Sequence, residues 1–152
     1  MGLFNFFLPH VKIRNTQASS LQRSWWRAFN VEEFAMQYML MIYGDESGRA
    51  KASKADMDQM FTAYTAYTQA LQKAGVMKDG NPLEASSTAS TVRIKDGKTK
   101  VLNGPYSESK EQLGGYYIIE VKDLDAALSW AAKCPGAQFG TMEVRPVMPM
   151  HG

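Results

Sequence analysis

The sequence predicts an α+β domain in which two helices pack on one face of a mostly antiparallel sheet. The predicted elements follow the order strand, helix, hairpin plus strand, helix, strand, which is typical of two-layer α+β domains. The pair Asp96–Gly97 separates two strand-like runs and signals a hairpin, because both turn positions need a positive φ. At 152 residues the chain is long enough for one domain with a core of its own.

The first half of the predicted domain contains a strand, a helix and a loop. Residues 38–43 form an apolar run too short for a helix, so we expect a strand that is buried on both faces. Ser53 and Asp56 resemble a capping box and predict a helix start, and the apolar residues that follow at helical spacing end at Gly75. Residues 78–87 are rich in Gly, Pro, Asn and Ser and are predicted to be a loop.

The second half contains the hairpin, two further strands and a helix. The hairpin strands are predicted at 91–95 and 98–102, and the β-branched and aromatic residues of 116–121 predict another strand. Asp123 is a candidate N-cap for the second helix. Residues 141–147 alternate apolar and polar side chains as a half-exposed strand does, and a proline near their end favours an edge position.

The segment 101–121 joins a turn, a charged run and a strand. Its residues read Asn103-Gly104-Pro105-Tyr106, then Glu108-Ser109-Lys110-Glu111, then Gly114-Gly115-Tyr116-Tyr117. This order resembles the signature of the YCII-related, or DGPF-domain, family of small bacterial proteins, and the resemblance extends from Met36 to Val147. It implies a ferredoxin-like two-layer sandwich that pairs with a second copy into a dimeric α/β barrel. A homodimer agrees with the sequence, because a sheet with both helices on one face needs a cover for the other.

Composition and charge exclude several classes of site and partner. The chain has one cysteine, Cys134, and two histidines, His10 and His151, so we expect no internal disulfide, no metal site and no cofactor. The net charge of +2 lies within residues 1–35, and residues 36–152 are neutral, so we expect no nucleic-acid partner. The scarcity of cysteine fits a cytoplasmic location.

Residues 1–35 differ in character from the rest of the chain. They are free of acidic residues as far as Val31, and the apolar cluster at 3–8 is too short to span a bilayer and has the wrong order for a secretory signal. A transit-like or membrane-touching peptide is one interpretation. We favour another, in which residues 1–35 are a mis-called upstream extension and Met36 is the true start. The domain is then 36–152, and no membrane partner is expected.

The loop at 103–111 is the first candidate ligand site. The resemblance implies an aspartate, a potential acid or base, at the position of Asn103, which forms hydrogen bonds but does not titrate. Ligand binding and a plain tight turn are the alternatives here. Tyr106 adds a phenol where the family has phenylalanine, for ligand contact or for packing. Glu108 and Lys110 form either part of a small charged site or one solvated helical turn.

Further candidates lie on the predicted helix and strands. The resemblance implies a histidine on the first helix that acts in proton transfer, but Tyr64 lies near that position. Tyr64 is therefore a hydrogen-bond donor to a ligand or a core residue, and with Glu108 it is a candidate catalytic residue. Arg93 and Arg145 clamp a ligand carboxylate if both face a cleft, and form ordinary salt bridges otherwise. Five methionines between residues 36 and 60 line an apolar pocket or pack in the core.

Three functions are compatible with these observations. The leading expectation is a homodimeric, cytoplasmic protein with a small-molecule pocket near the Asn103-Gly104-Pro105-Tyr106 turn, for which the resemblance implies a regulatory or stress-linked role. The second is a cofactor-free isomerase or dehydrohalogenase-like enzyme acting on a small cyclic metabolite, by analogy with proteins of the same fold. The third is a ligand-free homodimer that acts through protein contacts. The sequence leaves the ligand, and the choice between enzyme and binding protein, open.

Overall fold

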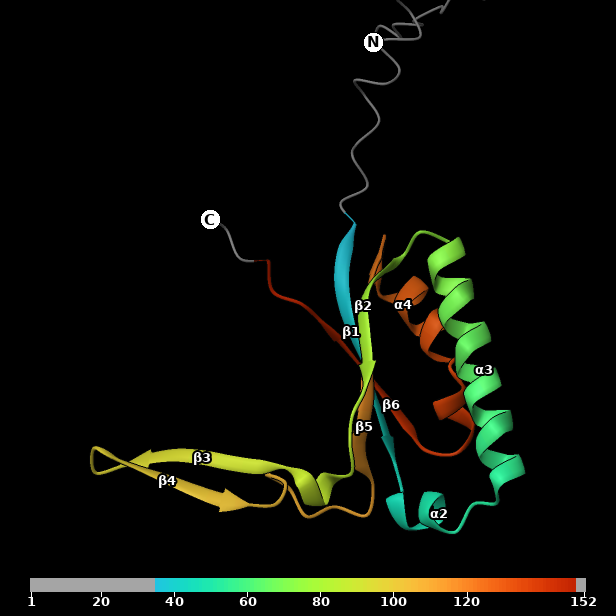
Figure 1. The fold of residues 1–152 in the computed structure, drawn as a ribbon. Helices are drawn as coiled ribbons and strands as arrows, with labels where there is room; N and C mark the ends of the chain where they lie inside the picture. Colours follow the sequence, from blue (N-terminus) through green and yellow to red (C-terminus); the bar gives the residue numbers. More distant parts are fainter. Residues whose placement is uncertain (1–34, 150–152) are drawn as a thin grey trace, which may run out of the picture. The chain divides into compact units, whose positions relative to one another are not determined.

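The structure, a computed structural model, describes residues 35–149 as a sheet layer, a helix layer and a separate hairpin (Figure 1). The helices are α2 (Glu46–Ala50), α3 (Lys54–Lys73) and α4 (Leu124–Ala131). The strands are β1 (Met36–Gly44), β2 (Met77–Pro82), β3 (Ser90–Lys95), β4 (Lys98–Asn103), β5 (Gln112–Val121) and β6 (Thr141–Pro146). Short 3₁₀ turns lie at Ser86–Thr88 and Pro135–Gln138. The expectations for residues 1–34 lie outside the described residues.

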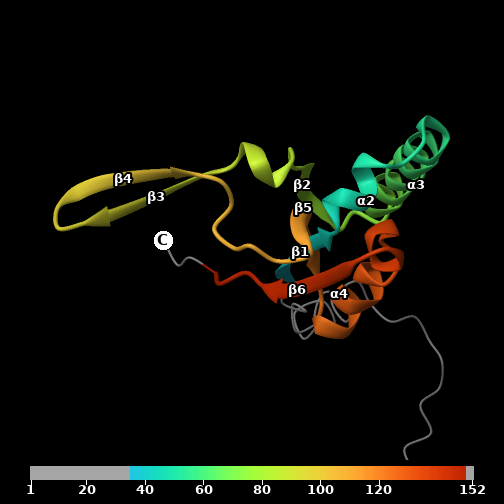
Figure 2. The ribbon, with the colours of Figure 1, turned by 90° about the horizontal axis from the view of Figure 1, so that it is seen from below.

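The main sheet has four strands in the order β2-β5-β1-β6, and every neighbouring pair is antiparallel. Helices α3 and α4 lie on the same side of this sheet in both ribbon views (Figures 1 and 2). The strand order and the single helix layer confirm the predicted ferredoxin-like α+β sandwich. The sheet is open rather than closed into a barrel, and β6 lies at its edge as its proline predicts.

The core lies between the sheet and the helix layer. Alternate residues of each strand face the helices, so Leu40 of β1 and Ile119 of β5 meet Leu71 of α3, and none of these three side chains is exposed. Tyr67 joins this cluster, and its hydroxyl donates a hydrogen bond to the carbonyl oxygen of Trp130 at 3.0 Å. The C-terminal half of α3 is therefore packed firmly onto the sheet.

Local signals predicted the starts of α3 and α4 and the hairpin turn correctly. The Ser53 hydroxyl accepts from the backbone N–H of Asp56 at 3.2 Å, and the Asp56 carboxylate accepts from the backbone N–H of Ser53 at 3.0 Å, which confirms the capping box. Asp123 caps α4 by accepting from the backbone N–H of Ala126. In the turn between β3 and β4, Asp96 has φ 53° and Gly97 has φ 72°, as that hairpin type requires.

Two elements were missed by the sequence prediction. Residues 78–87 were predicted to be a loop, but β2 (Met77–Pro82) pairs with β5. Strand pairing uses backbone groups that every residue but proline has in full, so a run without apolar alternation still forms an edge strand. The break predicted after Gly44 contains the one-turn helix α2, which begins with Asp45 as N-cap. The hairpin β3–β4 forms a two-stranded sheet of its own.

The prediction that β1 is buried on both faces is wrong for one face. The face with Tyr38 and Leu40 packs on the helices. The other face, which we call the open sheet face, carries Met39, Met41 and Tyr43. Met41 is buried, whereas Met39 and Tyr43 are only half-buried. Nothing among residues 35–149 forms a layer over it, because both helices lie on the opposite side (Figure 1).

Candidate functional site

A cavity of about 910 Å³ lies between α3, the helix α2 and the sheet, and its lining on α3 extends from Met57 to Gln72. Met57, Met60 and Tyr64 of α3 line it and are half-buried. They follow the same helical spacing as Tyr67 and Leu71, which are buried farther along the same helix. The sheet-facing stripe of α3 is thus packed at its C-terminal end and faces a cavity at its N-terminal end.

Glycines form much of the opposite wall of this cavity. They come from β1, β2, β5 and the segment around the second 3₁₀ turn: Gly44, Gly80, Gly114, Gly115, Gly136 and Gly140. A Cβ at Gly80 would lie 2.6 Å from the ring atom Cδ1 of Tyr117, whereas a Cβ at Gly44 would meet nothing within 4 Å. Gly80 therefore permits close packing against Tyr117, whereas a side chain at Gly44 would have open space around it.

The hydroxyl groups in the cavity come from α3 and β5. The Thr68 and Tyr117 hydroxyls are 2.9 Å apart and share a hydrogen bond. Burial raises the pKa of the Tyr64 phenol to about 12, with a further increase from the nearby Cys134 thiol and Tyr117 phenol and a small decrease from Arg49. Tyr64 is therefore protonated at neutral pH and is available as a hydrogen-bond donor.

Charged residues line the cavity on its α2 side. The Asp45 carboxylate accepts from the backbone N–H of Ser47 at 2.8 Å. Hydrogen bonding to the Ser47 side chain, and then to this backbone N–H, lowers the pKa of Asp45. The Glu46 carboxylate accepts from both the backbone N–H and the hydroxyl of Ser86, each at 2.8 Å. Arg49 lines the same side, and within residues 35–149 it forms no ion pair. The guanidinium is free to meet a polar or anionic group of a ligand.

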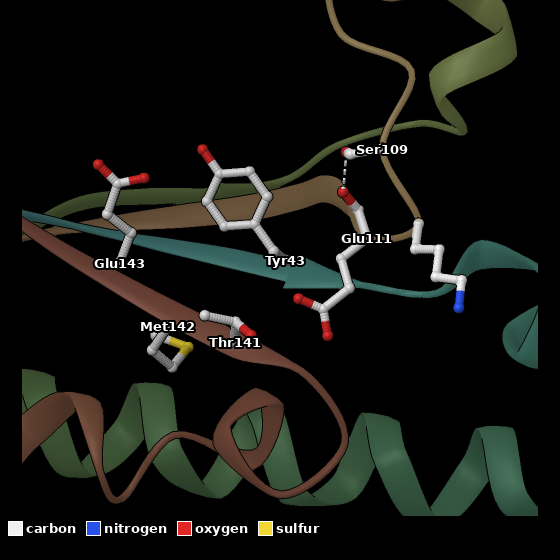
Figure 3. Close-up of a pocket in the computed structure, with 7 residues that line it drawn as sticks. Tyr43, Ser109, Glu111, Thr141, Met142 and Glu143 are labelled. Carbon is white, nitrogen blue, oxygen red and sulfur yellow. Dashed lines mark hydrogen bonds between the residues drawn. The ribbon is translucent and has the colours of Figure 1, made fainter.

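A second, more open hollow lies at one end of the sheet (Figure 3). Its lining residues are Tyr43, Ser109, Lys110, Glu111, Thr141, Met142 and Glu143. Figure 3 shows Tyr43 and Glu143 on the side of the strands away from the helices, while Met142 points toward the helices. The Ser109 hydroxyl donates to the carbonyl oxygen of Glu111. This hollow has a volume of about 720 Å³ and opens more widely to solvent than the cavity under α3.

The structure does not gather the predicted site residues in one place. Tyr64 lines the cavity under α3, and Lys110 lines the open hollow. Asn103 and Tyr106 line neither of them. The Arg93 guanidinium lies 5.6 Å from the centre of the Tyr106 ring, and Tyr106 is 82% exposed. The Asn103–Tyr106 turn therefore lies beside the hairpin, outside both hollows.

The remaining candidates lie at the surface. Glu108 is exposed and lines neither hollow, and residues 108–111 form no helical turn. Arg145 forms an ion pair with Glu143 on the same strand. Arg93 therefore lies against the Tyr106 ring and Arg145 pairs with Glu143, so the structure places the two arginines beside different partners.

Sequence reasoning missed two parts of the cavity. Arg49 lies on α2, a helix that was not predicted, so its position next to α3 had no signal in the sequence. Gly114 and Gly115 were noted as part of a motif, but their role in the wall was not inferred. A pair of glycines directly before a strand was the available signal, because a missing side chain on a sheet leaves room for something else.

Two further features of the described chain bear on function. Residues 35–149 hold no cluster of three or more His, Cys, Asp or Glu side chains placed to bind a metal ion. No helix among these residues has both the length and the apolar character needed to cross a bilayer. Burial raises the pKa of the Cys134 thiol, so this cysteine is a protonated core residue next to Tyr64.

The fold and the cavity define a ferredoxin-like α+β domain with a hollow between its first long helix and its sheet. The sequence model of the YCII-related domain matches residues 36–151, so this chain belongs to the YCII-related family. It is also similar to an uncharacterized protein of Rhizobium meliloti (strain 1021), with 34% identity over 114 residues. The match covers 74% of this chain and 92% of that protein.

Proposed function

We propose that this chain is a homodimeric, cytoplasmic binding protein for a small, mainly apolar molecule, and that the ligand occupies the cavity under α3. The observation that carries the proposal is the cavity itself, at about 910 Å³, because ligand pockets typically measure roughly 300–1,000 Å³. The position differs from the turn at 103–106, which lies outside the cavity lining.

The lining suggests the chemical character of the ligand. Methionine side chains are flexible and polarizable, and they make favourable contacts with aromatic rings. Met57, Met60 and Met77 line the cavity together with the Tyr117 ring. Tyr64 and Arg49 supply a hydrogen-bond donor and a cation at the same site. A ligand with an apolar ring and one polar or anionic group fits this combination.

The chemistry of the cavity favours binding over proton transfer. A general base works best with a pKa near the operating pH, whereas the pKa of Tyr64 is about 12. The carboxylates of Asp45 and Glu46 already accept hydrogen bonds from Ser47 and Ser86. Isomerase or dehydrohalogenase-like chemistry at this site therefore has less support than binding.

The open sheet face supports the homodimer. Cross-strand neighbours on one face of a sheet lie close together, so the register brings Met39 and Met41 of β1 next to Tyr116 and Ile118 of β5. This apolar strip has no helix over it in residues 35–149. Met41 is already buried, and a second copy would bury the remainder of the strip, which is half-buried: Met39, Tyr116 and Ile118. A regulatory or stress-linked role would then depend on which molecule binds.

The binding proposal is tested with a graded series at Gly44. The uncharged fluorescent probe N-phenyl-1-naphthylamine reports binding to apolar cavities. Gly44→Ala, Gly44→Val and Gly44→Leu add increasing volume at a wall position where a Cβ meets nothing within 4 Å. We expect the affinity for the probe to fall stepwise along this series while the melting temperature stays close to that of the wild type. Unchanged affinity in the leucine variant would contradict a ligand site at this cavity.

Native mass spectrometry of the protein purified from its native host gives a second test. A dimer that carries a reproducible small adduct would support both halves of the proposal and supply the ligand for identification. A monomer at every concentration would contradict the homodimer, whatever the result at Gly44.

A further inference from the structure

The β3–β4 hairpin, which we call the hairpin arm (residues 90–103), exposes apolar side chains. Four of them are each more than 60% exposed within the described chain: Val92, Ile94, Val101 and Leu102. An isolated two-stranded hairpin is marginally stable at best in water, and it normally needs a third strand or a helix to pack against. The hairpin arm has neither within residues 35–149.

The two faces of the hairpin arm differ in character. Val92 pairs with Val101 and Ile94 with Thr99, and paired residues two positions apart share a face. This apolar face contains no charged side chain along that stretch. The opposite face carries four cations: Arg93, Lys95, Lys98 and Lys100. Within the described chain none of these four forms an ion pair.

The hairpin arm extends on the side of the main sheet that carries no helix. Figures 1 and 2 both show β3 and β4 extending from the sheet on the side opposite α3 and α4. This is the side of the open sheet face. A partner that covers the open sheet face would therefore lie beside the hairpin arm and within its reach.

The hairpin arm and the rest of the domain carry net charges of opposite sign. Four cations and Asp96 give the arm a net charge of +3. Residues 35–149 contain thirteen Lys and Arg and thirteen Asp and Glu, so the rest of these residues carries −3. The arm of one copy is thus electrostatically complementary to the body of another, and such complementarity steers association and fixes orientation.

We propose that the apolar face of the hairpin arm packs against a second copy of this chain, the same copy that covers the open sheet face. The inference rests on the proposed homodimer and adds to it the element that extends the interface. Val92, Ile94 and Val101 are then buried between protomers, and the net positive charge of the arm, carried by its opposite face, attracts the acidic body of the partner. The arm is stable because the partner supplies the packing that its own chain lacks.

The first test compares the dimer dissociation constant of variants by sedimentation velocity on the full chain. The double variant Val92→Thr/Ile94→Thr keeps residues that favour strands and removes apolar contact in both protomers. We expect the dimer to weaken roughly tenfold or more, because each buried aliphatic group contributes substantially to association. Leu128→Gln is the matched control, since Leu128 is a 48% exposed leucine on α4, and we expect it to leave the dimer unchanged.

The second test uses the wild-type protein and depends on no variant. Backbone amides of residues 90–103 are expected to be protected from hydrogen exchange at concentrations where the dimer is populated. This protection should be lost on dilution below the dissociation constant. Amides of β1 and β5 near Leu40 and Ile119 serve as the internal reference, because these strands pack in the core of a single copy.

Three results would overturn the proposal. A dimer that is unaffected by Val92→Thr/Ile94→Thr, with an arm that exchanges freely, would leave the homodimer standing and remove the arm from its interface. A wild-type monomer would overturn the arm and the homodimer together. Protection of the arm that appears only on adding phosphatidylglycerol vesicles would assign its apolar and basic faces to a membrane surface instead.

Discussion

The two halves of α3 meet the same sheet in different ways. At the C-terminal half, Tyr67 and Leu71 are buried against Leu40 and Ile119. At the N-terminal half, a cavity separates Met57, Met60 and Tyr64 from the glycines of the opposite wall. The helical pattern of large side chains is continuous, so the difference comes from the wall opposite. One half of the helix stabilises the domain, and the other leaves space that a ligand can fill.

The largest effect is expected from truncation at the packed end. Leu71→Ala removes a side chain with no exposure and should lower the free energy of unfolding by about 2–5 kcal/mol. Met57→Ala, at the cavity end of the same helix, should cost less than about 1 kcal/mol because its side chain is half-exposed. Urea denaturation followed by circular dichroism measures both. Equal losses would mean that the two halves of α3 are packed alike.

The glycines of the wall provide the next comparison. Gly80→Ala places a Cβ 2.6 Å from Tyr117 Cδ1 and should destabilise the domain by about 1–3 kcal/mol through overpacking. Gly44→Ala has open space and should change stability by less than about 1 kcal/mol. Thermal melting of the two alanine variants separates them. A neutral Gly80→Ala would show that the Tyr117 ring moves aside easily.

The Thr68–Tyr117 hydrogen bond lies between the two halves of the helix. Thr68→Val keeps the shape of the side chain but leaves the Tyr117 hydroxyl without this partner. We expect a loss of about 0.5–1.5 kcal/mol. Thr62→Val is the control, because Thr62 is exposed and bonds only to a backbone oxygen of its own helix, that of Asp58. Similar losses in the two variants would assign the effect to helix propensity rather than to the cavity.

The smallest effect concerns alkaline pH. The pKa of Tyr64 is raised from 10.0 to about 12 in the folded protein, so the folded state favours its neutral form. That contribution to stability is complete below pH 10 and is lost as the pH rises from 10 through 12. The melting temperature should therefore fall over this range, and it should fall less in Tyr64→Phe.

Part of that decline should survive in Tyr64→Phe. Burial also raises the pKa values of Tyr67 and Tyr117, and these two phenols lose their stabilising effect in the same direction. A decline of equal size in the wild type and in Tyr64→Phe would show that the Tyr64 phenol is as well solvated in the folded state as in the unfolded one.

The sequence predicted those features whose cause lies in adjacent residues. The capping box at Ser53 and Asp56 needs only two side chains three positions apart, and the turn at Asp96–Gly97 needs only two residues that tolerate positive φ. It also gave Tyr64 as a candidate site residue, and Tyr64 lines the cavity. It did not identify β2, because an edge strand of polar residues is held by backbone pairing with β5, which leaves no pattern in the sequence.

The candidate site shows the same division. Methionines and a glycine pair were visible as residues, but a cavity exists only where small residues on one element face a helix stripe on another. The ligand site was expected near Asn103 because that turn lies in the most distinctive motif. In the structure the later part of the motif, Gly114 to Tyr117, lines the cavity, and the turn lies beside the hairpin arm.

The sequence by itself determined the family, the α+β class, the starts of α3 and α4 and the hairpin, because each depends on local chemistry or on a motif read in order. Only the tertiary structure decided that β2 completes the sheet, that Arg49 lies beside Tyr64 and that the hairpin arm is left unpacked. These features depend on which distant segments face each other once the backbone has formed its sheet, and no short stretch of sequence contains that information.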